Sequence, residues 1–539
     1  MKKHNTLKVV LITLLVFLVL SWIFPAAYFS SEYVDQGRMQ MGLSDLFNFF
    51  MTSLSYFGHY AFYLVLVGCF YGVLYKIPAY RTFLDKVVAK VNAKAFLVVT
   101  VIVLALGVSV AGLQVGFAIF IPLIVALILL MGYDKIVAAM TVVGGLAAGL
   151  VGSTYAYNNN SIMLSIFSLD SNYQIGVRFL ILFVAIVVVL FNIFMYIKRS
   201  MGEVVVKAAP VKETKEEKVV ATKVEVEKPK KAATKSSSKA KTTTKKTTTK
   251  STKKTSARKN ANKAALRDED IIVVKEAVVN DSKEDLYLVP TRVEVTHKVW
   301  PFVVGFILLF VLLVMAWITW GEGGFGVSFF DTATEKFTEF ELFGFPIFQK
   351  VYGTVNSFGS WTFIDLCLPV TLLLTILVII YKVKFDDVLD GAIAGAKKAL
   401  LPAFVILVLY TMLVTVTYHP FQMSFYKAIL GLTKDFNIGT TTVSALIASI
   451  FNVDPSYVYQ AFLPYYSYLF TTSANFGLAA IISQTMVGFA SIFAPSSIIL
   501  MCTLAYLRVS YKDWLKNIWK LIVELFVILL IIFIILALV

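Results

Sequence analysis

Long apolar runs recur along the chain and predict membrane-spanning helices. A helix needs about 20 apolar residues to cross the hydrocarbon core of a bilayer. Runs of this kind cover residues 7–29, 58–75, 174–197, 299–320, 360–381, 399–418 and 517–538. This pattern predicts an all-α polytopic membrane protein, with amphipathic helices at the membrane surface over residues 44–57 and 80–91.

Two further apolar stretches are too long for one span, and each is interrupted near its middle by a short segment with polar residues. In residues 94–132 this segment is 111–116 (Ala-Gly-Leu-Gln-Val-Gly), and in residues 440–470 it is 452–456 (Asn-Val-Asp-Pro-Ser). Each stretch therefore predicts two short helices that meet at a tip inside the membrane, which is a re-entrant hairpin.

Each of these stretches is followed by an apolar segment that a polar cluster interrupts. Residues 136–170 are interrupted at 154–161, and residues 475–507 are interrupted at 494–497. Hydrocarbon offers no water to unpaired backbone groups, so unwound backbone at this depth is tolerated only inside protein or beside a cavity. Two such breaks, in corresponding places of two halves, are typical of secondary transporters with a site between the repeats.

Spacing and charge predict how the two halves are related. Gln114 precedes Asn159 by 45 residues, and Asp454 precedes Ser496 by 42. Basic loops occur at 76–90, 198–199, 382–398 and 508–516, which the positive-inside rule assigns to the cytoplasm. We therefore expect nine crossings, two of them broken, in inverted membrane repeats at 1–198 and 299–539. The N-terminus would be cytoplasmic and the C-terminus outside.

Composition supports this class and sets the middle of the chain apart. Hydrophobic residues make up 58% of the 539 residues, which is too many for a soluble protein of this length. The net charge of +16 comes mostly from residues 199–298, which hold 25 Lys and Arg against 14 Asp and Glu. Such a segment cannot bury a core, so it predicts a disordered Lys/Thr-rich cytoplasmic linker. Anionic lipid of the bilayer could attract it loosely, whereas nucleic acid is not an expected partner.

The sequence offers little to an enzyme. Cys69, Cys367 and Cys502 all fall in predicted spans and form neither a disulfide framework nor a metal-ligand spacing. The chain has four His and lacks a P-loop, an HExxH motif and a G-x-S-x-G motif. We therefore expect no catalytic activity and no cofactor, with sodium as a coupling ion at most.

Several short stretches follow one another in order along both halves. They are Gly-Val-Leu-Tyr-Lys at 72–76, the Pro122 stretch that ends in Met-Gly-Tyr-Asp at 131–134, Gly-Val-Arg-Phe at 176–179, Asp-Gly-Ala at 390–392, and Ala-Pro-Ser-Ser at 494–497. Together they resemble motifs of the YfcC-type carriers of the ion transporter superfamily, which includes four-carbon dicarboxylate carriers and aminobenzoyl-glutamate transporters. The resemblance implies inverted repeats with hairpins and discontinuous helices, and transport of small carboxylate-bearing solutes with sodium or protons.

Polar residues of the tips and breaks are the candidate ligands of a substrate or ion. Amides both donate and accept hydrogen bonds, and a helix N-terminus after each break would offer free N–H groups to an anion. The candidates are Gln114, Thr154, Asn158, Asn159, Asn160, Ser161, Asn452, Asp454, Ser456, Ser496 and Ser497.

Other interpretations stay open for several residues. The Asn cluster could be an extracellular loop, Gln114 could satisfy tip backbone, and Asp454 could cap a helix that starts at Pro455. Arg178, Asp365 and Glu524 lie in or near spans, where they could be functional or reach the interface.

The pattern as a whole predicts a secondary active transporter of a small organic solute, a carboxylate or an amino acid, in a bacterial inner membrane. It would work by alternating access, coupled to sodium or protons. One alternative is an exchanger of basic amino acids, with Asp454 facing the substrate amine. Another is a membrane scaffold whose basic linker recruits lipid or nucleic acid. The substrate, the ion and the oligomeric state, a homodimer being one option, stay open.

Overall fold

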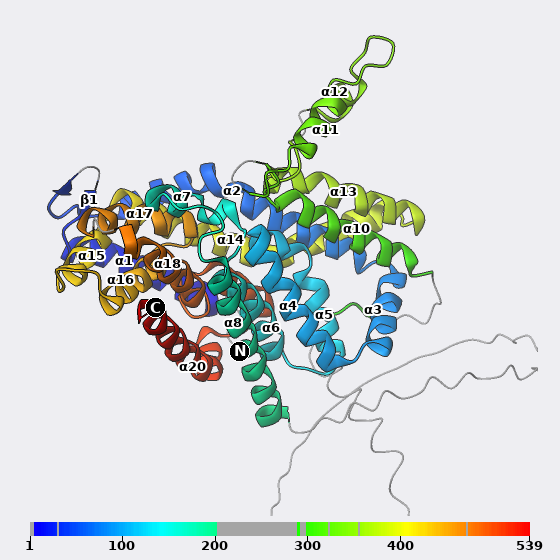
Figure 1. Cartoon of the computed structure of the whole chain (residues 1–539). Coiled ribbons are helices and arrows are strands. Elements are labelled where there is room, and N and C mark those ends of the chain that lie inside the picture. The colour runs from blue at the N-terminus through cyan, green and yellow to red at the C-terminus, as the bar shows by residue number, and fades with distance from the viewer. Residues whose placement is uncertain are drawn as a thin grey trace, which may run out of the picture. The chain divides into compact units, whose positions relative to one another are not determined.

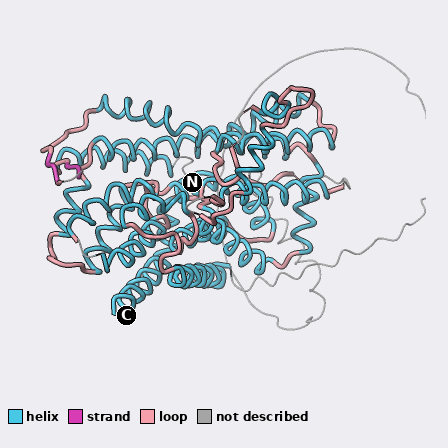
Figure 2. The backbone as a smooth tube through the Cα atoms, turned by 45° about the horizontal axis from the view of Figure 1, so that its top comes forward, coloured by secondary structure: helices cyan, strands magenta, loops and turns pink. Residues whose placement is uncertain are grey.

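The computed structural model of the protein describes residues 5–29, 32–201, 288–291, 298–321, 324–353, 356–470 and 473–538. Within these residues, eight helices are long and apolar enough to cross a membrane. The one sheet in this part is a short hairpin of β1 (Ala27–Phe29) and β2 (Tyr33–Asp35), magenta in Figure 2. The predicted all-α polytopic membrane fold is confirmed. Most of the predicted linker lies outside the described residues.

The helices fall into two series in chain order. The first series is α1 (Asn5–Ile23), α2 (Leu43–Leu74), α3 (Pro78–Lys90), α4 (Ala93–Ala111), the 3-10 turn η1 (Val115–Ile119), α5 (Ile121–Leu130), α6 (Lys135–Val151), α7 (Tyr157–Phe167) and α8 (Ile175–Met201). The second comprises α10 (Trp300–Trp317), α11 (Phe329–Thr338), α12 (Ile347–Tyr352), α13 (Phe363–Ile380), α14 (Phe385–Tyr418), α15 (Gln422–Leu430), α16 (Ile438–Phe451), α17 (Pro455–Leu469), the 3-10 turn η3 (Ser473–Asn475), α18 (Phe476–Ala490), α19 (Ile498–Leu507) and α20 (Tyr511–Leu538).

The two series repeat one arrangement, in which α1 to α8 correspond to α13 to α20. Helix α1 packs on α14 and α13 packs on α2, while α4 packs on α6 and α16 packs on α18. Three pairs of counterparts also contact each other: α2 with α14, α6 with α18, and α8 with α20. Such reciprocal packing is what two repeats related by an approximate twofold axis produce. Helices α11 and α12 stand away from the packed helices (Figure 1).

Both predicted hairpins are present. Helix α4 ends at Ala111, and Gly112 has a φ of 71°, a left-handed conformation that glycine adopts at no steric cost. The chain then forms η1 and returns as α5, which has Pro122 in its first turn. In the second hairpin α16 ends at Phe451, and α17 begins at Pro455.

Both broken helices are also present, but the first break is shorter than the sequence suggested. Helix α6 ends at Val151 and α7 begins at Tyr157, so the unwound segment is 152–156. Asn158, Asn159, Asn160 and Ser161 therefore lie in α7, and the prediction of unwound backbone up to Ser161 was wrong. The second break, between Ala490 and Ile498, contains both Ser496 and Ser497.

The longest helices, α2 and α14, lie against each other and form the most extensively packed pair. They approach closely because glycines face one another where they cross. A Cβ atom on Gly395 would lie 1.9 Å from the carbonyl oxygen of Gly68. Residues 44–57, predicted as a separate surface helix, are instead the first half of α2. The other predicted surface helix is present as α3.

Candidate functional site

A small cavity lies where the two hairpin tips meet the second break. We call it the tip cavity, and its empty volume is about 350 Å³. It is lined by Gln114, Leu150, Ser449, Asn452, Val453, Pro455, Val487, Ser491, Ala494, Ser497, Ile498 and Ile499. Three of the predicted site residues are thus brought together, one from each tip and one from the second break.

Two helix N-termini border this cavity. Pro455 and Ile498, the first residues of α17 and α19, both line it. Asp454 caps α17, since its Oδ1 accepts a hydrogen bond from the backbone N of Ser456 at 2.9 Å, and its carboxylate offsets the positive end of that helix. Helix α19 has a neutral cap, because Ser497 Oγ accepts from the backbone N of Leu500 at 3.2 Å. The partial positive charge of α19 is therefore not offset by its cap.

The hydrogen-bonding groups of the tip cavity differ in how far they are already engaged. The Nδ2 atom of Asn452 donates to the carbonyl of Ala448 at 2.9 Å, and Ser497 Oγ donates to that of Ser491 at 2.8 Å. Within the described residues, the side-chain amide of Gln114 makes no hydrogen bond. Gln114 can therefore donate to and accept from a solute without breaking an internal bond.

The first break is tied to the first hairpin rather than open to the tip cavity. Ser109 of α4 donates through Oγ to the carbonyl of Gly152 at 2.7 Å. Its own carbonyl accepts from the backbone N of Thr154 at 2.8 Å, and its hydroxyl also bonds that of Thr154 at 2.9 Å. Thr154, a predicted site residue, is 1% exposed. These bonds give Thr154 the role of joining the break to α4.

Arg178 satisfies the carbonyls that the first break sets free. Its side chain is 1% exposed, and its Nε donates to the carbonyl of Ser153 at 2.9 Å. One terminal nitrogen donates to the carbonyl of Ser171 at 2.7 Å, and the other donates to that of Thr154. The Nε2 of Gln484, on α18, also donates to Ser153, at 2.8 Å. Arg178 is thus buried against these carbonyls and does not line the tip cavity.

The Asn cluster packs on the first tip. A Cβ atom on Gly112 would lie 3.2–3.3 Å from the amide atoms of Asn159. Asn160 donates through Nδ2 to Ser153 Oγ at 3.0 Å. Among the described residues, no hydrogen-bond partner is present for Asn159 Nδ2 or Asn160 Oδ1, both of which are buried. Asn158, Asn159, Asn160 and Ser161 are absent from the lining of the tip cavity, where we expected them.

The second break is anchored in the same way as the first. Ser496 Oγ donates to the carbonyl of Ile450, near the end of α16, as Thr154 Oγ1 of the first break donates to the carbonyl of Ser109, near the end of α4. Trp514 Nε1 donates to the carbonyl of Ile492 at 3.0 Å. Trp514 is the fourth residue of α20, and Arg178 is the fourth residue of α8. Ser109, Gln484 and Trp514 were not predicted from the sequence, although the matching positions of Arg178 and Trp514 were a usable signal.

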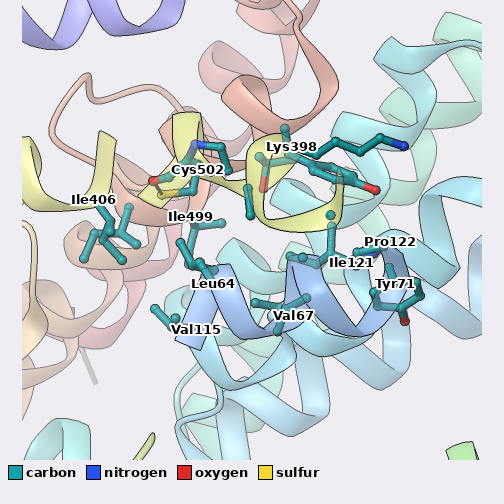
Figure 3. Close-up of a pocket in the computed structure, with 18 of the residues that line it drawn as sticks. Leu64, Val67, Tyr71, Val115, Ile121, Pro122, Lys398, Ile406, Ile499 and Cys502 are labelled. Atoms are coloured by element: carbon teal, nitrogen blue, oxygen red, sulfur yellow. Dashed lines mark hydrogen bonds between the residues drawn. The ribbon is translucent and has the colours of Figure 1, made fainter. Parts of the chain in front are cut away.

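Two larger cavities adjoin the tip cavity. The apolar cavity, of about 880 Å³, lies among α2, α5, α14 and α19 and shares Gln114, Ile498 and Ile499 with the tip cavity (Figure 3). The outer cavity, of about 650 Å³, is lined by β1, the end of α14, α15 and α17, and shares Asn452 with it. The three cavities therefore form a row, with Gln114 and Asn452 at the two junctions.

The remaining polar candidates have local partners. Asp365 caps α13 by accepting from the backbone N of Thr362 at 2.7 Å. Glu524 accepts from Asn192 Nδ2 at 2.7 Å and so joins α20 to α8. Ser456 follows the cap of α17 and is absent from the lining of the tip cavity. In the described part of the chain, no three His, Cys, Asp or Glu gather into a metal site.

Comparison with known proteins finds no family model, no curated protein and no solved structure that matches this chain. The resemblance to the YfcC-type carriers stays a prediction from short motifs. A function is therefore inferred from the geometry of the tips, the breaks and the three cavities.

Proposed function

We propose that the protein is a secondary active transporter of a small carboxylate-bearing organic solute, and that the tip cavity is its binding site. The observation that carries this proposal is the N-terminus of α19 at Ile498, whose cap is neutral, beside the amide of Gln114 in the tip cavity. Discontinuous helices that point N-termini at an anionic group are a recurring feature of secondary transporters.

The row of cavities supports an alternating-access mechanism. Gln114 lines both the tip cavity and the apolar cavity, and Asn452 lines both the tip cavity and the outer cavity. Small movements of either hairpin would open the site toward one cavity and close it toward the other. Coupling to sodium or protons is part of the proposal, because carbonyls and hydroxyls at tips and breaks suffice for a sodium site.

The position of Asp454 favours a carboxylate over a basic amino acid as substrate. Its carboxylate accepts the backbone N–H of Ser456 as the cap of α17. Asp454 is also absent from the residues that line the tip cavity. An exchanger of basic amino acids would need this carboxylate at the substrate amine, so we retain the carboxylate carrier.

Replacing Gln114 with leucine tests the site. The KM of this variant for uptake of the transported solute into proteoliposomes should rise about 3- to 10-fold, because one to two hydrogen bonds to the solute are lost. The melting temperature should not change, because the amide has no internal partner among the described residues. The matched control is Gln349→Leu on α12, which lies away from the cavities and should leave the KM unchanged. Equal KM values for both variants would count against the tip cavity as the site.

The inverted topology predicts a definite labelling pattern. Single cysteines in place of Lys86, Lys397 and Lys512 should react with a membrane-impermeant maleimide only from the cytoplasmic side. A cysteine in place of Glu335, on α11 between the crossings α10 and α13, should react only from outside. The physical basis is the basic character of the three segments that hold Lys86, Lys397 and Lys512, which the positive-inside rule assigns to the cytoplasm. Labelling of the Lys86 and Lys397 positions from opposite sides would exclude the proposed arrangement.

A further inference from the structure

One short segment of the predicted linker is packed against the membrane helices. The structure describes residues 288–291, which lie between stretches of the linker outside the described residues. Leu288 is 1% exposed, Val289 is 7% exposed, and Pro290 is buried as well. The side chains of Leu288 and Val289 belong to the same hydrophobic core as the buried residues of α2, α3 and α10. We call residues 288–290 the docked segment.

Two side chains of the first series of helices hold the docked segment by its main chain. Tyr75, the C-cap of α2, donates through its hydroxyl to the carbonyl of Leu288 at 2.9 Å. Arg81, on α3, donates from a terminal nitrogen to the carbonyl of Pro290 at 2.8 Å, and its Nε donates to Asp85 Oδ1 at 3.0 Å. Asp85 lies one helical turn further along α3 and orients the guanidinium. Main-chain hydrogen bonds combined with buried side chains are a common way for a protein to bind a peptide segment.

The surface that holds the docked segment adjoins the apolar cavity. Tyr75 lines this cavity, together with Tyr71 and Gly72 of α2 and Cys502 of α19. Tyr75 also precedes the basic segment 76–90, which the positive-inside rule assigns to the cytoplasm. The hydrogen bond from Tyr75 to the docked segment therefore fixes a side chain at the edge of the cavity that faces the cytoplasm in the predicted topology.

We propose that Tyr75 and Arg81 form a binding site for an apolar peptide segment, that its occupant is the chain's own docked segment, and that docking closes the cytoplasmic edge of the apolar cavity. Leu288 and Val289 supply the buried contacts, and the carbonyls of Leu288 and Pro290 accept the two hydrogen bonds. Binding of the segment does not depend on the proposed function. Closure of the cavity bears on transport only in a carrier, so that part of the inference rests on the proposed function.

Thiol labelling tests the docking in the full-length protein. In a variant whose native Cys69, Cys367 and Cys502 are replaced by alanine, single cysteines replace Val289 or its exposed neighbour Thr291. In nanodiscs, a water-soluble maleimide should react about tenfold or more slowly at position 289 than at position 291, because a buried thiol is out of reach of the reagent. Equal rates at the two positions would overturn the docking.

Removal of the two hydrogen-bond donors should release the docked segment. Tyr75→Phe and Arg81→Met should each raise the labelling rate at position 289 about 3-fold or more, because each variant loses one hydrogen bond to a carbonyl. The matched control is Tyr56→Phe on the same helix α2, where the tyrosine is 71% exposed, and it should leave the rate unchanged. Rates equal to the control in both release variants would show that these side chains do not hold the segment.

The native thiol Cys502 reports whether the edge of the cavity is closed. With the other two native cysteines replaced by alanine, Cys502 is the remaining thiol, and it lines the apolar cavity. Leu288→Ser combined with Val289→Ser should raise its rate of methanethiosulfonate modification about tenfold, because the segment loses its buried apolar contacts. A synthetic peptide of residues 284–294 should restore the slow rate, whereas the same peptide with both serines should not. If Arg81→Met releases the segment but leaves the Cys502 rate unchanged, the proposed closure is wrong.

Uptake measurements separate this inference from the proposed function. Release of the docked segment that speeds modification of Cys502, without uptake of any solute by any variant, would keep the docking site and overturn the transporter. Gln114-dependent uptake, with equal Cys502 rates in the wild type and in Arg81→Met, would keep the transporter and overturn the closure. Uptake whose rate changes in Arg81→Met but not in Tyr56→Phe would support both proposals.

Discussion

Replacing Arg178 with methionine is expected to prevent the protein from folding stably. The guanidinium group is fully buried and donates to the carbonyls of Ser153, Thr154 and Ser171. Within the described residues, methionine would leave the carbonyls of Thr154 and Ser171 without a donor, whereas the carbonyl of Ser153 keeps the hydrogen bond from Gln484. Each buried acceptor left unpaired costs roughly 1–3 kcal/mol, so the sum is a large part of the stability of a typical domain.

The outcome is measured as the yield and melting temperature of monodisperse protein in detergent. Arg178→Lys should fall between the wild type and Arg178→Met, because lysine restores a charge and donors but not the planar fork. The control is Arg199→Met, at the exposed far end of the same helix α8, and it should melt like the wild type. An Arg178→Met protein that folds and melts normally would show that the break does not need this residue.

The positions of the hairpins followed from sequence because their causes are local. A left-handed glycine ends α4 at Gly112, and Pro455 with the cap of Asp454 starts α17. Both signals act over a few residues inside apolar stretches that are too long for one span. The ends of the first break were predicted less accurately because the residues that fix them are distant in the sequence. Ser109 and Arg178 fix the break through the carbonyls of Gly152 and Ser153, and they lie 43 and 25 residues away along the chain.

The length of α2 is likewise fixed by packing on a helix that is distant in the sequence. Residues 44–57 have a mixed polar and apolar pattern that predicts a surface helix. Helix α14 instead runs alongside them, and Ser53 Oγ donates to the carbonyl of Leu407 at 2.9 Å. Phe57 stacks on Tyr410 with ring centroids 4.0 Å apart. These contacts between distant segments keep the first half of α2 helical and continuous with the span.

The sequence identified the segments that form the tip cavity better than the side chains that face it. Gln114, Asn452 and Ser497 line the tip cavity as expected. Asn159 and Ser496 are polar residues beside or within the two breaks, but Asn159 packs on Gly112, and the hydroxyl of Ser496 donates to the carbonyl of Ile450. For Asn159, which lies in α7, helical rotation decides whether the side chain faces the cavity. A single residue changes the direction of a side chain by about 100°, so uncertain helix bounds leave that direction undetermined.

The second large effect is expected at the crossing of α2 and α14. Gly72→Ala should destabilise the protein by about 1–3 kcal/mol or more, because its Cβ would lie 2.1 Å from the carbonyl oxygen of Gly391. The obstructing atom is backbone, so the two helices must separate along their shared length to accept the methyl group. That separation would also widen the apolar cavity, which both helices line.

A glycine on the same helix provides the matched control. A Cβ on Gly58 would meet only the Cδ1 atom of Leu54, at 3.6 Å, which is ordinary van der Waals contact. Gly58→Ala should therefore be neutral or stabilise by up to about 1 kcal/mol through helix propensity alone. The same propensity gain is present in Gly72→Ala, so the difference between the two melting temperatures isolates the cost of the close crossing. If Gly72→Ala raises the melting temperature as much as Gly58→Ala does, the helices do not approach this closely. The closely packed pair α2 and α14 could then not serve as the rigid scaffold of the proposed alternating-access mechanism.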